Sequence, residues 1–197
     1  MKVTINEMTF ETIIKATKNC VLTDCSRPIL QQIKFVVNTD KITAYSLDGF
    51  TASKITIPHT SDAEFTVYFP PFKFKASKNK NRTVTITKED DVAIIEIETP
   101  TIIEQTYRFM QPTENGVDIE KIYKDNSNHT AEIGFNAAYM VRAFNNIKAV
   151  VSGRRRHAAI IQIKDNPNEP IIIKGEEENV VIEELVLPIK TFIIPRP

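Results

Sequence analysis

Hydrophobic and polar residues alternate with period two along many short segments of the chain, a pattern typical of β-strands with one buried face. The first such segment, MKVTIN at residues 1–6, precedes a stretch with the period of an amphipathic helix, residues 7–19. The predicted buried face of this helix carries Phe10, Ile13, Ile14 and Thr17, and the opposite face carries Glu11, Lys15 and Lys18. The chain is therefore expected to begin with a strand and a helix that has one apolar face.

The same order of one strand, one helix and three strands is then repeated. After Arg27-Pro28 the alternation predicts strands at 29–37, 41–48 and 51–58, with Asp48-Gly49 turning the chain between the last two. The second repeat begins with a strand at 64–69, and Pro70-Pro71 is a helix-start signal. A short helix is expected at residues 72–78, although the alternation there also fits a strand. Further strands are predicted at 82–89, 92–99 and 103–110.

A polar, turn-rich segment at about 111–129 reads as a linker to a third repeat. This repeat has a predicted strand at 130–135, Asn136 as the helix N-cap, and a buried helical stripe of Met140, Phe144 and Ile147. Three strands at 157–164, 169–176 and 180–189 complete it. The fold class expected from the three repeats is α+β, built from βαβββ units with antiparallel sheets and helices on one face.

Composition indicates an ordinary soluble globular protein of the cytoplasm. The 197 residues are 42% apolar and 25% charged, and 25 Lys+Arg balance 25 Asp+Glu. Any nucleic-acid binding must therefore come from segregation of charge. The sequence has no apolar run long enough to span a membrane and begins with a strand-like alternation, which argues against a secretory signal.

Chemistry-bearing residues do not form a recognisable catalytic or metal-binding pattern. Cys20 and Cys25 are compatible with a disulfide or half of a metal site, but free thiols are favoured because no second pair completes a tetrahedral set. His59, His129 and His157 are scattered, and consecutive carboxylates such as 176–178 point in different directions. We therefore predict a protein that is not an enzyme and has no metal or cofactor.

Several local strings resemble the bacterial DNA sliding clamp family, the beta subunit of DNA polymerase III. Residues 27–53 resemble its middle domain, 132–144 resemble the second half of its last domain, and 170–190 resemble its C-terminal strands. That family builds each domain from two βαβββ units and closes its domains into a ring around DNA, with helices lining the hole. The resemblance implies a clamp-like domain at 1–122 and half of such a domain at 129–197.

The chain departs from the family in having three units where a clamp has six. A lone unit leaves a sheet edge unpaired, so the third unit is expected to find a partner in another chain. Because the two units of a clamp domain are related by a pseudo-two-fold axis, two copies of the third unit are suited to pair symmetrically. The resulting hypothesis is a homo-oligomer, with four chains supplying the twelve units of a ring.

Basic residues concentrate on the predicted helices and just after them, where a clamp faces DNA. Duplex DNA would be held through its backbone, without reading of the bases, and each contact would release counterions. The alternative is that charges on an exposed helix face serve only solvation. The predicted DNA-binding residues are Lys15, Lys18, Lys73, Lys75, Lys78, Lys80, Arg82, Arg142, Lys148, Arg154, Arg155 and Arg156.

The resemblance also implies a hydrophobic pocket for a short peptide of a polymerase or repair protein. The matching positions are Leu47, Gly49, Phe50, Thr51, Ala52, Val186, Leu187, Pro188, Ile189 and Lys190. The loop reads LDGFTAS where the family reads close to TDGHRLA, and losing the His-Arg pair removes hydrogen-bonding capacity. Alternatively, Leu187 and Ile189 are core residues of a last strand.

The function expected from these features is that of a clamp-like processivity factor, which encircles or contacts duplex DNA and tethers replication or repair proteins. The alternative is a clamp-derived interaction or regulatory module that binds a partner protein without forming a ring.

Overall fold

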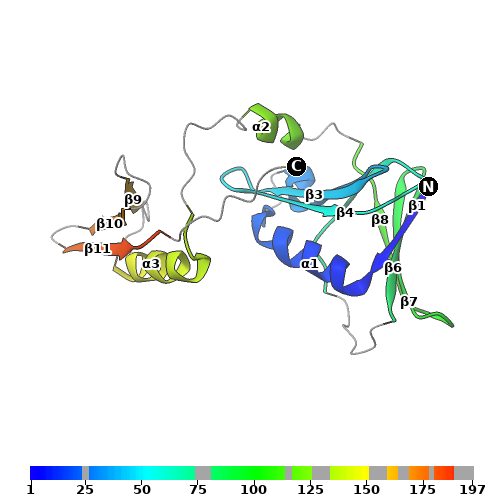
Figure 1. The fold of residues 1–197 in the computed structure, drawn as a ribbon. Helices are drawn as coiled ribbons and strands as arrows, with labels where there is room; N and C mark the ends of the chain where they lie inside the picture. The colour runs from blue at the N-terminus through cyan, green and yellow to red at the C-terminus, as the bar shows by residue number, and fades with distance from the viewer. Residues whose placement is uncertain are drawn as a thin grey trace. The chain divides into compact units, whose positions relative to one another are not determined.

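The protein is described here by a computed structural model covering residues 1–23, 27–73, 81–113, 117–125, 134–150, 159–163, 169–177 and 180–188. The chain divides into two compact units, Met1–Asp125 and Asn126–Pro197, which we call unit 1 and unit 2 (Figure 1). All strand pairs in the described parts are antiparallel, which confirms the predicted α+β class.

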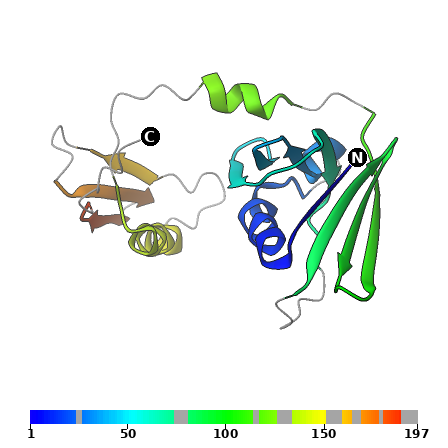
Figure 2. The ribbon, with the colours of Figure 1, turned by 45° about the vertical axis from the view of Figure 1, so that its right-hand side comes forward.

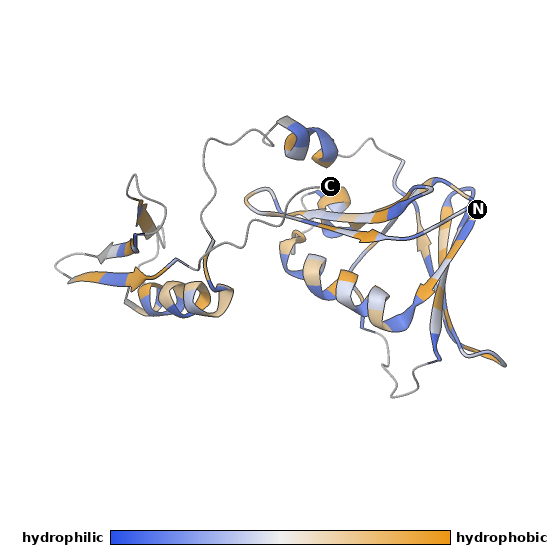
Figure 3. Ribbon diagram, in the orientation of Figure 1, coloured by the Kyte–Doolittle hydropathy of each residue, from blue (hydrophilic) through white to orange (hydrophobic). Residues whose placement is uncertain are grey.

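Unit 1 contains eight strands and two α-helices in the described residues. Its elements are β1 (Lys2–Asn6), α1 (Glu7–Thr17), β2 (Ile33–Val37), β3 (Lys41–Leu47), β4 (Ala52–Pro58), β5 (Phe65–Phe69), β6 (Thr83–Glu89), β7 (Val92–Glu98), β8 (Ile103–Met110) and α2 (Ile119–Asp125). Short 3-10 turns lie at Lys18–Cys20 and Pro28–Gln31. The predicted strands of the first two repeats are confirmed, and hydrophobic and hydrophilic residues alternate along them (Figure 3).

The two halves of unit 1 exchange their first strands. One sheet has the order β1-β6-β7-β8 and the other β4-β3-β2-β5 (Figure 2). Thus β1 precedes α1 in the chain but pairs with β6, where Ile5 lies opposite Val84. In the same way β5 pairs with β2, where Val67 lies opposite Phe35. Each sheet therefore consists of three consecutive strands and one strand from the other half.

Helix α1 packs between the two sheets of unit 1. It contacts β3 and β4 of one sheet and β1 and β6 of the other. The side chain of Asn6 accepts a hydrogen bond from the backbone N–H of Met8 at 2.8 Å and caps the helix. The predicted apolar face is confirmed as buried, and its members are Phe10, Ile13, Ile14 and Thr17. Thr17 is accommodated there because its hydroxyl donates to the carbonyl of Ile13 at 2.8 Å.

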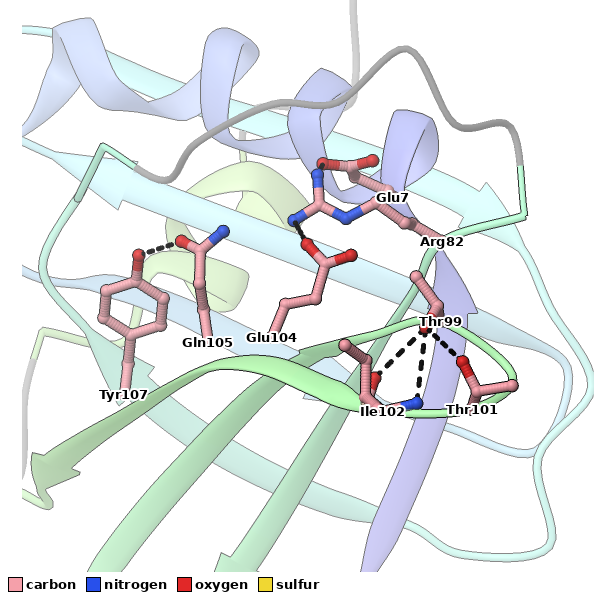
Figure 4. A network of polar contacts seen from close by, with 8 residues as sticks. All are labelled: Glu7, Arg82, Thr99, Thr101, Ile102, Glu104, Gln105 and Tyr107. Atoms are coloured by element: carbon pink, nitrogen blue, oxygen red, sulfur yellow. Dashed lines mark hydrogen bonds and ion pairs between the residues drawn. The ribbon is translucent and has the colours of Figure 1, made fainter.

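Arg82 is buried beneath the start of α1, with 1% of its side chain exposed. Its Nη1 lies 2.7 Å from Oε1 of Glu7, and its Nη2 lies 3.0 Å from Oε2 of Glu104 (Figure 4). The prediction that Arg82 contacts DNA is therefore wrong, because its guanidinium is enclosed and neutralised by carboxylates of α1 and β8. The ion pair with Glu7 instead joins the two halves of unit 1.

A second correction concerns the segment that the sequence indicated as a linker. Residues 119–125 form α2, whose N-terminus is capped by Oδ1 of Asp118, accepting from the N–H of Lys121 at 3.0 Å. Ile119 is buried. The signal was present in the sequence, as Asp118 stands before a helical spacing of Ile119, Ile122 and Tyr123.

Helix α2 contacts the face of the sheet opposite to α1. Lys34 and Lys54 both lie opposite Tyr45 in the strand register, so the three side chains share this face. Glu120 accepts a hydrogen bond from Nζ of Lys34 at 2.6 Å, and Tyr123 packs on Tyr45 with ring centroids 6.1 Å apart. Burial alone lowers the pKa of Lys34, but the hydrogen bond and charge of Glu120 outweigh it, so the pKa is raised.

Unit 2 consists of α3 (Ala137–Val150), β9 (Ala159–Gln162), β10 (Ile171–Glu177) and β11 (Val180–Val186), with sheet order β11-β10-β9. Asn136 is confirmed as the N-cap, since its Oδ1 accepts from the N–H of Ala138 at 2.9 Å. The buried stripe of α3 differs from the prediction. Ala143 and Ile147 are buried, but Phe144 is 38% exposed because it lies at the margin of the helix face that covers the sheet.

Two predicted elements fall largely outside the described residues. Of the helix predicted at 72–78, only Phe72 and Lys73 are described, and neither is helical. Of the strand predicted at 130–135, Gly134 and Phe135 are described, and Phe135 forms an isolated antiparallel bridge with Pro188.

We predict that Arg82→Ala lowers the free energy of unfolding of unit 1 by about 3–5 kcal/mol, because it leaves the buried carboxylate of Glu7 without its counter-charge. Urea unfolding followed by circular dichroism measures this change. The control is Lys41→Ala, which removes a solvent-exposed ion pair with Asp40 and is expected to cost less than about 1 kcal/mol. Equal effects of the two substitutions would contradict a structural role for Arg82.

Candidate nucleic-acid interface and partner pocket

Three of the predicted DNA-binding lysines line one groove on unit 1. Lys15 and Lys18 come from the exposed side of α1 and its C-cap, and Lys73 comes from the segment after β5. The groove encloses about 470 Å³. We call it the lysine groove, and its lining is Glu11, Ile14, Lys15, Lys18, Asn19, Pro71, Phe72 and Lys73.

Phe72 explains why residues so far apart in the chain meet at this groove. Its ring packs 6.0 Å from Phe10 of α1 and 4.5 Å from Tyr107 of β8, centroid to centroid. These contacts hold the segment after β5 against α1. Lys73, the next residue, is thereby placed beside Lys15 and exposed to solvent.

The lining of the lysine groove carries a net positive charge, because three lysines face one carboxylate. Nζ of Lys15 lies 2.8 Å from Oε1 of Glu11 in an i,i+4 pair on the helix surface. Such exposed pairs contribute little free energy, so Lys15 can exchange Glu11 for another anion at small cost. The groove therefore presents three ammonium groups on one concave surface, and that of Lys15 can exchange the anion it contacts.

The other predicted basic residues do not join this groove within the described structure. Arg82 is buried in unit 1. Arg142 and Lys148 are exposed on α3 of unit 2, where the Arg142 guanidinium lies 5.4 Å from the ring centroid of Tyr139. Lys75, Lys78, Lys80, Arg154, Arg155 and Arg156 lie outside the described residues.

One part of the predicted peptide pocket is the loop between β3 and β4. Oδ1 of Asp48 accepts from the N–H groups of Phe50 at 2.8 Å and Thr51 at 2.6 Å, and Oδ2 accepts from the Thr51 hydroxyl at 2.9 Å. Gly49 has φ +94°, a conformation that favours glycine. The turn predicted at Asp48-Gly49 is confirmed, and it presents Phe50 with almost its whole side chain in solvent.

Flanking positions of this loop have different surroundings. Leu47, the last residue of β3, is half-buried, whereas Thr51 and Ala52 are exposed. The loop thus offers one fully exposed aromatic ring on a turn that Asp48 rigidifies.

The other part of the predicted pocket is the end of β11 in unit 2. Val186 is buried in the core, while its neighbours Leu185 and Leu187 are 62% and 63% exposed. These two leucines line a hollow of about 290 Å³ together with Tyr139 and Arg142 of α3. Leu187 is therefore not a core residue within the described structure. Pro188 is half-buried beside Phe135, and Ile189 and Lys190 lie outside the described residues.

The structure thus describes each part of the predicted pocket within its own unit. Sequence reasoning omitted Leu185 and Tyr139 from the β11 part and Phe72 from the lysine groove. A signal for Leu185 was present, because residues two apart in a strand lie on the same side, and Leu185 precedes the predicted Leu187 by two. Phe72 had no such signal, since its role depends on rings brought from α1 and β8.

Metal-binding clusters and membrane-spanning helices are absent from the described part of the chain. None of its helices has the length and apolarity needed to cross a membrane. Within the same residues, no three His, Cys, Asp or Glu side chains cluster in a way that could hold a metal ion. Cys20 is a free thiol there.

A comparison of the sequence with models of protein families finds no match, and neither does a comparison with curated proteins. Solved structures, in contrast, match over almost the whole chain. The beta chain of DNA polymerase III from Streptococcus pneumoniae matches with a TM-score of 0.74 and 16% identity, covering 96% of this chain and 50% of that one.

DNA polymerase sliding clamps give similar values. The clamp from Pseudomonas aeruginosa has a TM-score of 0.72 and 16% identity, covering 95% of this chain and 51% of its own. The clamp from Bacillus subtilis has a TM-score of 0.70 and 13% identity, covering 95% and 49%. The chain therefore has the sliding-clamp fold and spans about half the length of these proteins, as the resemblance predicted for a shortened clamp-like chain.

We predict that Asp48 titrates below an ordinary aspartate, since hydrogen bonds from Thr51 and then Phe50 hold the pKa of its carboxyl below 3.8. This stabilisation is present above the unfolded-state pKa and is lost as the pH falls through the folded-state pKa. Carboxyl chemical shifts followed by NMR report the titration directly.

The matched variant is Asp48→Asn, which keeps the shape but removes the titration. Its difference in unfolding free energy from the wild type is expected to shrink as the pH falls below about 4. A difference that is constant with pH would contradict the role of the Asp48 carboxylate in this loop.

Proposed function

We propose that the protein is a sliding-clamp-like processivity factor, which contacts duplex DNA without sequence preference and tethers replication or repair proteins. The observation that carries this proposal is the match of 95–96% of the chain to solved clamps. At 9–17% identity this likeness shows the fold alone, so the proposed function depends on the surfaces of this chain.

Contact with DNA is supported by the lysine groove. In a clamp the helices face the DNA, and α1 is the element that presents Lys15 and Lys18. Ammonium groups near phosphates release counterions and attract a duplex without reading its bases. Contacts that exchange easily, such as that of Lys15 with Glu11, suit a protein that moves along DNA. Arg142 and Lys148 of unit 2, and the predicted basic residues outside the described structure, are proposed to contact DNA as well.

Tethering is supported by two exposed apolar features at positions where clamps receive a partner peptide. One is Phe50 on its rigid turn, and the other is the hollow beside Leu185 and Leu187. A hydrophobic groove with few polar groups is suited to a short apolar peptide. The partners are proposed to be polymerase or repair proteins.

The remaining parts of the proposal concern chemistry, location and assembly. The protein is proposed to act without catalysis, metal or cofactor, in the cytoplasm, as a homo-oligomer. The alternative is a clamp-derived module that binds a partner protein without forming a ring. The exposed side chains of Phe50, Leu185 and Leu187 favour this alternative, since an apolar surface of this kind suits a protein partner with or without a ring.

We predict that replacing Lys15, Lys18 and Lys73 together with alanine weakens binding to a random-sequence duplex. The slope of log Kobs against log salt concentration should become shallower by about 1 for each lysine that no longer neutralises a phosphate. Fluorescence anisotropy with two unrelated duplexes, each measured across a salt series, tests both the salt slope and the absence of sequence preference.

The matched control replaces three exposed lysines that do not line the groove, Lys2, Lys41 and Lys121, with alanine. It changes the net charge by the same amount, so only the position of the charges differs. If both triple variants show the same fall in affinity and slope, attraction is general and the lysine groove is not the DNA-binding surface.

We also predict that short peptides selected from a display library on the wild-type protein lose binding to Leu187→Asp. The loss should be at least tenfold, because burying a leucine side chain is worth about 1.5–3 kcal/mol. The control is Ile103→Asp, which places a carboxylate at an exposed apolar position of β8. Peptides that bind both variants equally would contradict the pocket at β11.

A further inference from the structure

We propose that the uncovered apolar face of unit 2 is completed by the same face of a second copy of this chain. This inference deepens the homo-oligomer of the proposed function by naming the surface through which copies meet. The face consists of the core side of β9, with Ile161, and the margin of α3 that carries Phe144 and Val141.

The two halves of unit 1 show how strands of this fold become fully buried. In β2, Ile33, Phe35 and Val37 face the core and are 0–1% exposed. In β6, Val84 and Ile86 are completely buried. Both strands pair on one edge with a strand of the other half, and α1 packs across both sheets. Each of these strands thus gains an edge partner that its own half does not provide, and β6 is also covered by the helix of the other half.

The corresponding strand of unit 2 lacks this cover. Ile161 lies opposite Ile173 in the register with β10, and Ile173 is fully buried in the core beneath α3. Since directly paired residues point to the same side of a sheet, Ile161 also points to the core side. Nevertheless it is 45% exposed, and Ile163, two residues further, is 60% exposed. In the described structure β9 pairs with β10 alone.

Helix α3 shows the same incompleteness. In unit 1, α1 contacts β1, β3 and β4 of its own half and also β6 of the other half. The main contacts of α3 are to β10 and β11 of its own half. The margin of α3 that carries Val141 and Phe144 remains in solvent, with both side chains exposed. Exposed apolar side chains gathered in this way mark an interaction surface.

A second copy is the occupant favoured by the internal symmetry. The core side of β9 can be covered by the apolar margin of a helix such as α3. The apolar margin of α3 can be covered by the core side of a strand such as β9. Unit 2 carries one of each, so two copies related by a two-fold axis satisfy both at once. Lys148 follows Phe144 by one turn on the same margin, and its long side chain can keep the ammonium in solvent at the rim of the interface.

The test is the solution mass of the full chain by light scattering during size exclusion, at loading concentrations from about 1 to 100 µM, a range that populates micromolar complexes. The expected mass approaches twice the 22.4 kDa of one chain, or a larger even multiple. Copies carrying two different affinity tags should also co-purify after mixing. A mass of one chain throughout the series would overturn the proposal.

Two variants of the same strand locate the interface. Ile161→Lys places a charge on the core side of β9 and should reduce the mass at least twofold. Ile160→Lys is the matched control, because Ile160 lies opposite Lys174 on the other side of the sheet and is also exposed. Circular dichroism of both variants shows whether they stay folded. Equal loss of assembly in two folded variants would overturn the proposed face.

The same samples separate this inference from the proposed function. A monomer whose DNA binding depends on Lys15, Lys18 and Lys73 would overturn the interface and leave the function standing. An assembled protein whose DNA binding is unchanged without these lysines would support the interface and contradict the proposed DNA-binding surface.

Discussion

A βαβββ half of this fold completes its sheet only when another half contributes a strand at the edge, and in unit 1 helix α1 packs on both sheets. In unit 1 this constraint is met by exchange, with β1 joining β6 and β5 joining β2. The single core formed in this way includes residues of both halves. Neither half has a complete core of its own, so the exchange determines where α1 lies, which residues reach the lysine groove and what unit 2 lacks.

The exchange also explains why a charged triad is found in the interior. The start of β6 passes directly under the N-terminus of α1, and Arg82 is carried there by the chain. Glu7 from the first half and Glu104 from the second neutralise it, so the cost of burying a guanidinium is offset by two carboxylates. The nearby turn is closed by Thr99, whose hydroxyl accepts from the N–H of Ile102 (Figure 4). Geometry at this junction therefore depends on polar groups as well as on the apolar core.

Much of unit 1 was predictable because its strands alternate and its turns carry strong signals, as at Asp48-Gly49. The exposure of Lys15 and Lys18 was predictable in the same way, from their positions in the helical spacing. The fate of Arg82 could not be predicted, because its partners lie 75 residues before it and more than 20 after it. Helix α2 was missed since seven residues give a weak local pattern, and contacts of Glu120 and Tyr123 with the sheet hold it. The same limit applies to Phe72, whose position depends on aromatic rings from distant strands.

The pairing of β1 with β6 has a consequence for synthesis of the protein on the ribosome. Thr4 and Thr85 share a hydrogen bond across 81 residues of chain. At about 5–20 residues per second, the N-terminal strand waits roughly 4–16 s before its neighbour has been made. During that interval β1 is without its partner strand, and α1 is without its contacts to β6. Contacts of such long sequence separation also fold slowly. The nascent chain is thus expected to rely on chaperones at this stage more than a protein built from local pairs.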